Sequence, residues 1–264
     1  MKITILGCGS SGGVPVVGCK CDTCSSNMKY NKRMRSSIFV ESGDVQLLVD
    51  TTPDLRFQAL QNNLSSVDAV LYTHFHADHC DGIADLQQFL PKHDVNNIPI
   101  YSDMTTLCLL TASNSYLFIP SGHSFTSKKC SHLKANIIYY YKEFIIKDFR
   151  ILAVKQIHGI DNSNGFIFNN LVAYCTDVKS FPEESWKFLY KKKVLILGCL
   201  KYDASFGHSH VDLCLDWVKE LKPEVAILTH MSHYLEYYSL TDYIKSHSKD
   251  NIIVGYDGMQ FNVL

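Results

Sequence analysis

Three histidines and one aspartate lie within a six-residue segment of this 264-residue chain, His74-Phe75-His76-Ala77-Asp78-His79. An apolar run over residues 67–72 precedes them and predicts a buried strand. Because side chains alternate along an extended segment, His74 and His76 are expected to face the same way where the strand ends. Asp78 and His79 follow at a turn, ahead of a helix predicted to begin near residue 81. Imidazole nitrogen and carboxylate oxygen suit zinc, manganese or iron, so the segment predicts a metal site.

The alternative is that these four residues are ordinary surface side chains at the end of a strand. For any one of them alone that interpretation would be preferred. For the four together it is disfavoured, because convergent titratable groups are electrostatically costly without a cation between them.

A second metal-binding pattern lies in the polar loop near residues 18–26, where Cys19, Cys21 and Cys24 form a C-x-C-x-x-C cluster. Three thiolates can bind one zinc ion but leave its tetrahedral shell one ligand short. Three unconnected reduced cysteines are the alternative. If zinc is bound, the fourth ligand should come from elsewhere in the chain, with a histidine favoured, and the site would be structural.

Three more residues that could bind metal each follow an apolar run. His158 follows residues 153–157, Asp177 follows residues 172–176, and His230 follows residues 225–229. Alone, each would be a polar residue at a strand end. The metal motif upstream makes a ligand role the better interpretation of all three.

The remaining pattern predicts the elements that position these side chains. Residues 36–50 predict a hairpin, and strands predominate from 136 to 177. Further on, helices alternate with strands, and the helices are expected over 182–190, 211–221 and 234–246.

Two loops have separate interpretations. The formal G-x-G-x-x-G at Gly7–Gly12 lacks a following helix, since Gly13 and Pro15 oppose one, so a tight turn passing close to a site is expected instead of a dinucleotide site. Residues 111–135 lack clear periodicity and are expected to form a long loop or lid, in which His123 and His132 are exposed.

Composition limits the remaining choices. The chain is 46% hydrophobic and 19% charged with a formal net charge of -1, so no global attraction to phosphate backbones or lipid surfaces is expected. Neither a signal peptide nor a membrane span is recognised, and a single cytoplasmic domain over residues 1–264 is expected. In that compartment the ten cysteines are expected to be reduced thiols or metal ligands.

The motif H-x-H-x-D-H resembles the signature of the metallo-β-lactamase superfamily. That resemblance implies an α/β (α+β) fold, a four-layer αββα sandwich of two mixed sheets with metals at one edge. It also implies two divalent ions, zinc or manganese. One would be held by His74, His76 and His158, the other by Asp78, His79 and His230, with Asp177 bridging.

Within that superfamily, the opening G-C-G-S-S-G-G-V-P, the C-x-C-x-x-C and the final T-H-M-S-H look like the PhnP-type phosphodiesterases. This narrower resemblance implies that His233 completes a structural zinc site with Cys19, Cys21 and Cys24. It also matches His210, ahead of the helix at 211–221, to a catalytic histidine, with His208 as the alternative. Asp78 is expected to serve in catalysis as well as in metal binding.

The expected function is therefore hydrolysis of a small cyclic or diester phosphate by a dinuclear-metal hydroxide. A thioester or other ester hydrolase of the same fold is one alternative, and a non-catalytic accessory protein like PqqB, which shares much of the N-terminal stretch, is another. A tRNA-processing endonuclease is disfavoured because no clear basic insertion is present. For the same reason a long nucleic acid is disfavoured as a partner. A homodimer is left open.

Overall fold

The computed structural model describes residues 1–89, 97–118 and 132–264, and these form two mixed β-sheets of seven strands each. The strands of the first sheet are, in spatial order, β14 (Gln260–Asn262), β1 (Lys2–Gly7), β2 (Ser37–Ser42), β3 (Val45–Val49), β4 (Ala69–Leu71), β5 (Asn97–Ser102) and β6 (His132–Ile137). Those of the second are β13 (Ile252–Val254), β12 (Val225–Thr229), β11 (Val194–Gly198), β10 (Val172–Cys175), β9 (Asp161–Phe168), β8 (Phe149–His158) and β7 (Glu143–Ile146).

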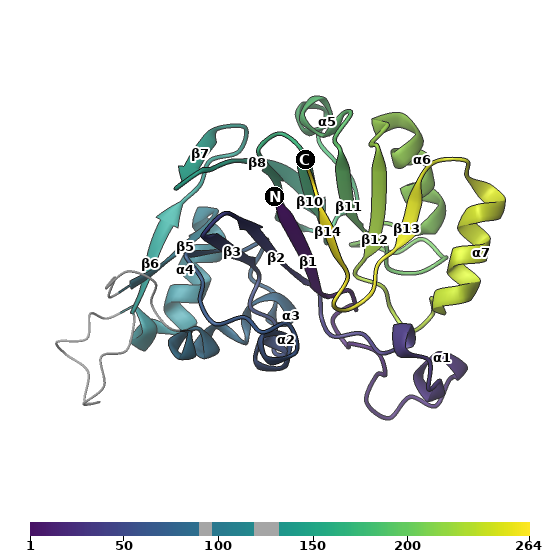
Figure 1. The fold of residues 1–264 in the computed structure, drawn as a ribbon, viewed down its shortest axis with the longest axis horizontal. Helices are drawn as coiled ribbons and strands as arrows, with labels where there is room; N and C mark the ends of the chain where they lie inside the picture. Colours follow the sequence, from purple (N-terminus) through teal and green to yellow (C-terminus); the bar gives the residue numbers. More distant parts are fainter. Residues whose placement is uncertain (90–96, 119–131) are drawn as a thin grey trace.

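Helices cover the outer faces of the two sheets (Figure 1). The α-helices are α1 (Asp22–Ser25), α2 (Leu55–Gln61), α3 (Ala77–Cys80), α4 (Met104–Ser113), α5 (Glu183–Leu189), α6 (Val211–Leu221) and α7 (Tyr237–His247). Short 3-10 helices span Lys29–Asn31, Ile83–Gln88 and Ser115–Leu117. None of the helices in the described ranges is long and apolar enough to cross a lipid bilayer.

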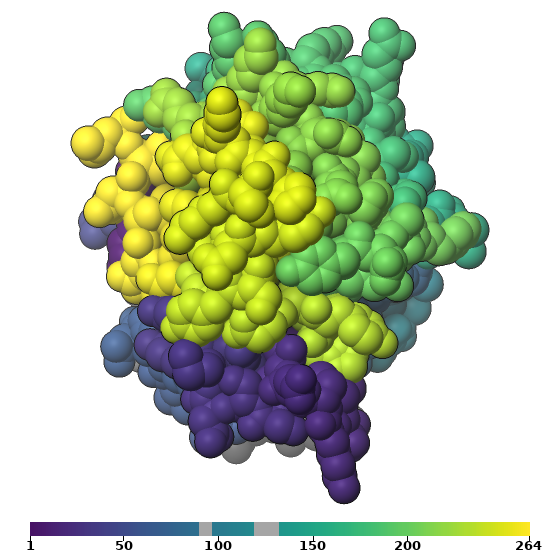
Figure 2. Space-filling model, turned by 90° about the vertical axis from the view of Figure 1, so that its right-hand side faces the viewer, coloured from purple at the N-terminus to yellow at the C-terminus, as the bar shows by residue number. Residues whose placement is uncertain are grey.

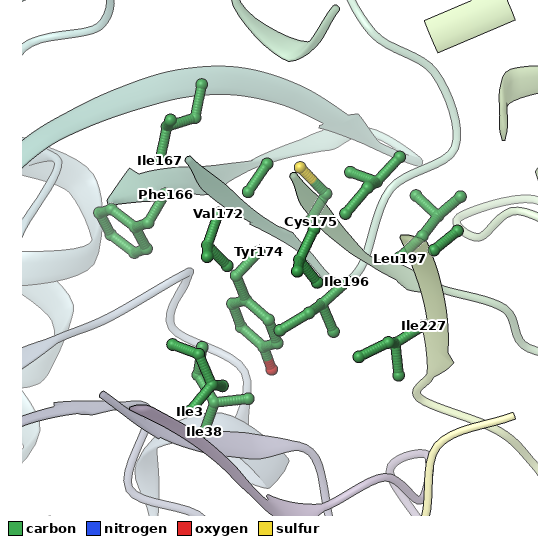
Figure 3. Packing of buried hydrophobic residues seen from close by; sticks show 14 of the residues in the cluster. Ile3, Ile38, Phe166, Ile167, Val172, Tyr174, Cys175, Ile196, Leu197 and Ile227 are labelled. Carbon is green, nitrogen blue, oxygen red and sulfur yellow. The ribbon is translucent and has the colours of Figure 1, made fainter. Parts of the chain in front are cut away.

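Alternation along the strands divides the core into layers. In β2, Ile38 and Val40 belong to the cluster between the two sheets, whereas Phe39 between them belongs to a second cluster with Leu55 of α2 and Leu107 of α4. Figure 3 shows the inter-sheet layer, in which Ile3 and Ile38 of the first sheet face residues of the second, including Phe166, Tyr174 and Ile196. The expected four-layer αββα sandwich is confirmed.

Parallel pairing sets where the functional residues gather. β3 and β4 run parallel in the first sheet, and β10, β11 and β12 run parallel in the second. The carboxyl ends of parallel neighbours meet at one sheet edge, so the loops after these strands lie together. This edge holds the candidate metal ligands.

Most expected elements occur near their expected bounds, with differences after residue 76 and between residues 111 and 142. The helix expected near residue 81 is a single α-helical turn, Ala77–Cys80, followed by the 3-10 segment Ile83–Gln88. The loop expected over 111–135 is helical to Ser113 and a strand from His132, so His132 is a half-buried strand residue and not an exposed loop residue. Residues 119–131, with His123 and the centre of the expected lid, lie outside the described residues.

Candidate metal centre

Three histidines form one group of ligand atoms. His74 Nε2 lies 2.9 Å from His76 Nδ1, and His158 Nε2 lies 3.3 Å from the same atom. His74 and His76 follow β4, while His158 ends β8. The side chains of His74 and His158 are buried, and burial lowers the pKa of His74 well below its usual value. A neutral imidazole is the form that binds metal.

Asp78, His79 and His230 form the second group. His79 Nε2 lies 3.3 Å from Asp78 Oδ2, and His230 Nε2 lies 3.5 Å from the same oxygen. Burial opposes ionisation of Asp78, but the neighbouring rings of His79 and His230 outweigh it and lower the pKa of Asp78.

Asp177 lies between the two groups. Its carboxylate oxygens lie 3.1 Å from His79 Nε2, 3.2 Å from His230 Nε2 and 3.8 Å from His158 Nε2. The side chain is 2% exposed, and the positive potential of His230 and His79 outweighs burial and lowers its pKa well below the usual value. One buried carboxylate thus approaches both histidine groups.

The donor atoms fit divalent cations. His79 Nε2 and both ring nitrogens of His230 are buried without a hydrogen-bond partner among the described residues. An unpaired buried polar atom is costly, and metal coordination removes that cost. The carboxylates of Asp177, Asp78 and Asp50 raise the pKa of His79 against the effect of its burial, so the surroundings of this ring favour positive charge.

The backbone at the centre is unusual. Asp50, Asp177 and His230 have φ angles of 65°, 51° and 55°, and each directly follows the end of a strand or lies within two residues of it. L-residues rarely adopt this left-handed region, and such strain concentrates at functional sites.

Sequence reasoning missed Asp50. This aspartate follows β3, is fully buried and accepts a hydrogen bond from His79 Nδ1 over 2.7 Å. Thr73 donates to it from its backbone N–H and its hydroxyl, both over 2.8 Å. The hairpin ending at residue 50 was predicted, so the position of an aspartate at a strand end could have indicated a role for Asp50 at the site.

The structure separates the two histidines of the segment His208-Ser209-His210. His208 Nδ1 lies 3.5 Å from Asp177 Oδ1, and the His208 ring stacks on that of His230 with centroids 5.0 Å apart. His210 is the N-cap residue of α6 and belongs to none of the metal-ligand groups found among the described residues. The geometry therefore favours His208 over His210 at the centre.

A cavity of about 320 Å³ opens onto the centre. Its lining includes the candidate metal ligands His76, Asp78, His158, Asp177 and His230, together with His208. Ser11 of the glycine-rich turn and Phe206 border it as well. The expectation that the turn passes close to a site agrees with this position of Ser11.

The cysteine cluster lies apart from this cavity. Cys19, Cys21 and Cys24 place their Sγ atoms 3.2, 3.6 and 3.5 Å from His233 Nδ1. All four ligand atoms lie within 4.8 Å of one another, which suits one tetrahedral zinc ion. Figure 2 shows the N-terminal segment packed against the C-terminal part of the chain, where Tyr30 contacts Tyr237 with ring centroids 4.6 Å apart.

The chain belongs to the β-lactamase superfamily, since the model of the β-lactamase superfamily domain matches residues 46–231. Its structure superposes on that of a diphosphatase from the PhnP family with a TM-score of 0.88 and 28% identity, covering 100% of this chain and 98% of that one. The expected resemblance to this group is confirmed, and together these findings support a metal-dependent hydrolase.

Two curated relatives match over part of their length. An octanoyltransferase of Porphyromonas gingivalis is 28% identical over 237 residues, which is 89% of this chain but only 46% of that protein. A coenzyme PQQ synthesis protein B of Methylorubrum extorquens is 33% identical over 105 residues, or 34% of this chain and 35% of that protein. The chain thus spans about half the length of the first relative.

Proposed function

We propose that the protein is a metal-dependent phosphodiesterase that hydrolyses a small cyclic or diester phosphate. The observation that carries the proposal is the buried carboxylate of Asp177 between two histidine groups, an arrangement suited to two divalent ions side by side. Zinc or manganese ions held there by the seven side chains would supply Lewis acidity toward a phosphoryl oxygen and lower the pKa of a water molecule. The seven are His74, His76, Asp78, His79, His158, Asp177 and His230.

The protein's own side chains have further roles in this proposal. Asp78 borders the cavity and its lowered pKa keeps it ionised, so it can bind metal and orient water. His208 faces the same cavity, and burial together with the nearby positive charge of His230 lowers its pKa to about 3. At neutral pH its ring is neutral, and it can donate one N–H hydrogen bond to a phosphoryl or leaving-group oxygen.

A double variant tests the proposal. His74→Ala with His76→Ala removes two ligands of one group and should abolish both metal loading and hydrolysis of bis(p-nitrophenyl) phosphate. His247→Ala, at an exposed histidine on α7, is the matched control and should retain both. Undiminished hydrolysis by the double variant would refute a dinuclear phosphodiesterase.

The long match to an octanoyltransferase favours one second candidate, hydrolysis of an acyl ester or thioester by the same metals. A panel of p-nitrophenyl acyl esters and acyl thioesters, measured beside the phosphodiester, separates the two activities. The partial match to coenzyme PQQ synthesis protein B raises the non-catalytic alternative. That alternative predicts bound metal with no turnover of any substrate in the panel.

A further inference from the structure

A second cavity of about 400 Å³ adjoins the metal-centre cavity, and the two share Ile160 and Asp161 in their lining. Ile160 lies in the turn between β8 and β9, and Asp161 is the first residue of β9, shortly after His158. Asp161 Oδ2 lies 3.7 Å from His76 Nε2, so the shared wall borders a metal-binding side chain. The volume is within the range of roughly 300–1,000 Å³ that is typical of small-molecule sites.

Phe75 links the second cavity to the metal centre through the His76 ring. It lies between the ligands His74 and His76 in the chain, and its ring packs edge-on against His76 with centroids 5.1 Å apart. The same residue lines the second cavity. A group bound there would therefore lie within reach of a phosphate held at the metal centre.

The rest of the wall is largely apolar and aromatic. Tyr139 and Tyr140 follow β6 and line the cavity beside Ile137 and Met104. Four large hydrophobic side chains of the lining are solvent-exposed: Met104 at 55%, Ile137 at 41%, Tyr139 at 62% and Ile160 at 88%. Clusters of exposed apolar side chains mark ligand-binding grooves and interaction surfaces. A ligand that covered them would remove this apolar surface from water.

The charged groups of the wall disfavour an anionic ligand, and Lys142, whose Nζ lies 5.4 Å from the centroid of the Tyr139 ring, disfavours a cationic one. Among the described lining residues, the charged side chains are the carboxylates of Asp103 and Asp161, which would repel a second anionic group. Asp103 is held in place as the N-cap of α4, where it accepts hydrogen bonds from the backbone and hydroxyl of Thr106. Asn162 adds an amide that can pair with a polar ring edge.

From these observations we infer that the second cavity binds an uncharged planar ring carried by the phosphate ester, of the kind found in a nucleobase or an aryl group. The inference rests on the proposed phosphodiesterase function and specifies its substrate class. Tyr139 is the specificity-determining residue, because aromatic side chains stack on planar rings without requiring a particular hydrogen-bond pattern.

Equilibrium binding to the metal-loaded protein tests the inference without relying on turnover. Phenylphosphonate and methylphosphonate share the anionic group that the metals would bind and differ in the ring. Titration calorimetry should show phenylphosphonate binding about 10-fold more tightly than methylphosphonate, the gain expected for one stacked ring. Thymidine 5′-monophosphate tests the nucleobase as the source of the ring, and n-hexylphosphonate supplies an equal number of carbons without planarity.

Variants of Tyr139 test whether this residue causes the preference for phenylphosphonate. Tyr139→Ala should bring the ratio of phenylphosphonate affinity to methylphosphonate affinity, the phenyl-to-methyl ratio, close to 1 while leaving methylphosphonate affinity unchanged. Tyr139→Phe should restore the ratio. Tyr190→Ala is the matched control, because this exposed tyrosine caps the carboxyl end of α5 and should keep the wild-type ratio.

Three outcomes would overturn the inference. They are a phenyl-to-methyl ratio near 1 in the wild type, a ratio that Tyr139→Ala leaves unchanged, and a preference for the hexyl chain over the phenyl ring. Any of them together with normal hydrolysis of bis(p-nitrophenyl) phosphate would reject this substrate class and leave the phosphodiesterase proposal standing. Absence of phosphodiester hydrolysis would instead reject that proposal, whatever the binding ratios.

Discussion

Asp50 Oδ2 lies 2.7 Å from His79 Nδ1, and both side chains are fully buried. The contact joins two residues that are 29 positions apart in the sequence. Because His79 Nδ1–H donates to this carboxylate, the other ring nitrogen, Nε2, faces Asp78 and Asp177 and is free to bind metal. Asp50 is thus a positioning residue for the proposed metal centre.

Asp50→Asn should weaken binding of metal at the His79 side of the centre by about 10- to 100-fold, because an amide orients the imidazole less well than a carboxylate does. Metal content measured by mass spectrometry against a series of competing chelator concentrations checks this. Asp216→Asn, at an exposed position of α6, provides the control. Equal metal retention by the two variants would contradict the positioning role.

His208→Ala should lower kcat for bis(p-nitrophenyl) phosphate by about 100-fold while metal content stays unchanged, as expected when one transition-state hydrogen-bond donor is removed. His210→Ala should change kcat by less than about threefold, because that residue lies outside the metal-ligand groups. Steady-state kinetics with a metal assay on the same samples measures both effects. If His210→Ala caused the larger loss of kcat, the assignment of roles would be reversed.

Cys21→Ser should remove about one zinc ion per chain and lower the melting temperature, since a closed zinc site contributes to folding stability. The catalytic pair should remain bound. Metal analysis combined with thermal unfolding tests this, and Cys108→Ser, at an exposed cysteine outside the cluster, is the control. Unchanged zinc in the Cys21 variant would rule out the structural site.

Asp257 should make stability depend on pH in a direction opposite to that of an ordinary paired carboxylate. Burial raises its pKa to about 6, although its carboxylate accepts hydrogen bonds from the backbone N–H groups of Cys8 and Met34. The folded state therefore favours the protonated form. Its stabilising effect is full below the unfolded pKa of about 3.9 and is lost as pH rises through about 6.

Urea unfolding of the wild type and of Asp257→Asn at several pH values between 4.5 and 7 measures this contribution. The stability of the wild type relative to the variant should fall by about 2 kcal/mol across that interval. Subtracting the free energy of unfolding of the variant from that of the wild type cancels the pH dependence of metal binding that both proteins share. A difference that is constant or that grows with pH would contradict the raised pKa.

Local spacing was sufficient to predict part of the centre. His74, His76, Asp78 and His79 lie within six residues, so their convergence depends on one strand end and one turn. The later residues His158, Asp177 and His230 could be placed because each follows an apolar run, and because the resemblance supplied their order. The sandwich fold was predicted from the same resemblance.

Long-range contacts account for what was not predicted. Nothing in the local sequence around Asp50 indicates that it reaches His79, because that contact depends on the parallel pairing of β3 and β4. The choice between His208 and His210 depends on Ser209, whose backbone N–H donates to Val178 O over 2.6 Å and whose carbonyl accepts from Leu200 N–H over 3.0 Å. These bonds, formed with residues distant in sequence, fix the segment so that His208 approaches Asp177.

The left-handed backbone at Asp50, Asp177 and His230 has a consequence for protein engineering. Glycine would relieve backbone strain of roughly 1 kcal/mol at each position, but at Asp50 it would also leave the buried donors of Thr73 and His79 without their carboxylate acceptor. At Asp177 and His230 the same change would delete a side chain of the proposed metal centre. The three positions are therefore poor targets for stabilisation by glycine, because the strain relieved is opposed by the hydrogen bonds or the bound metal that would be lost.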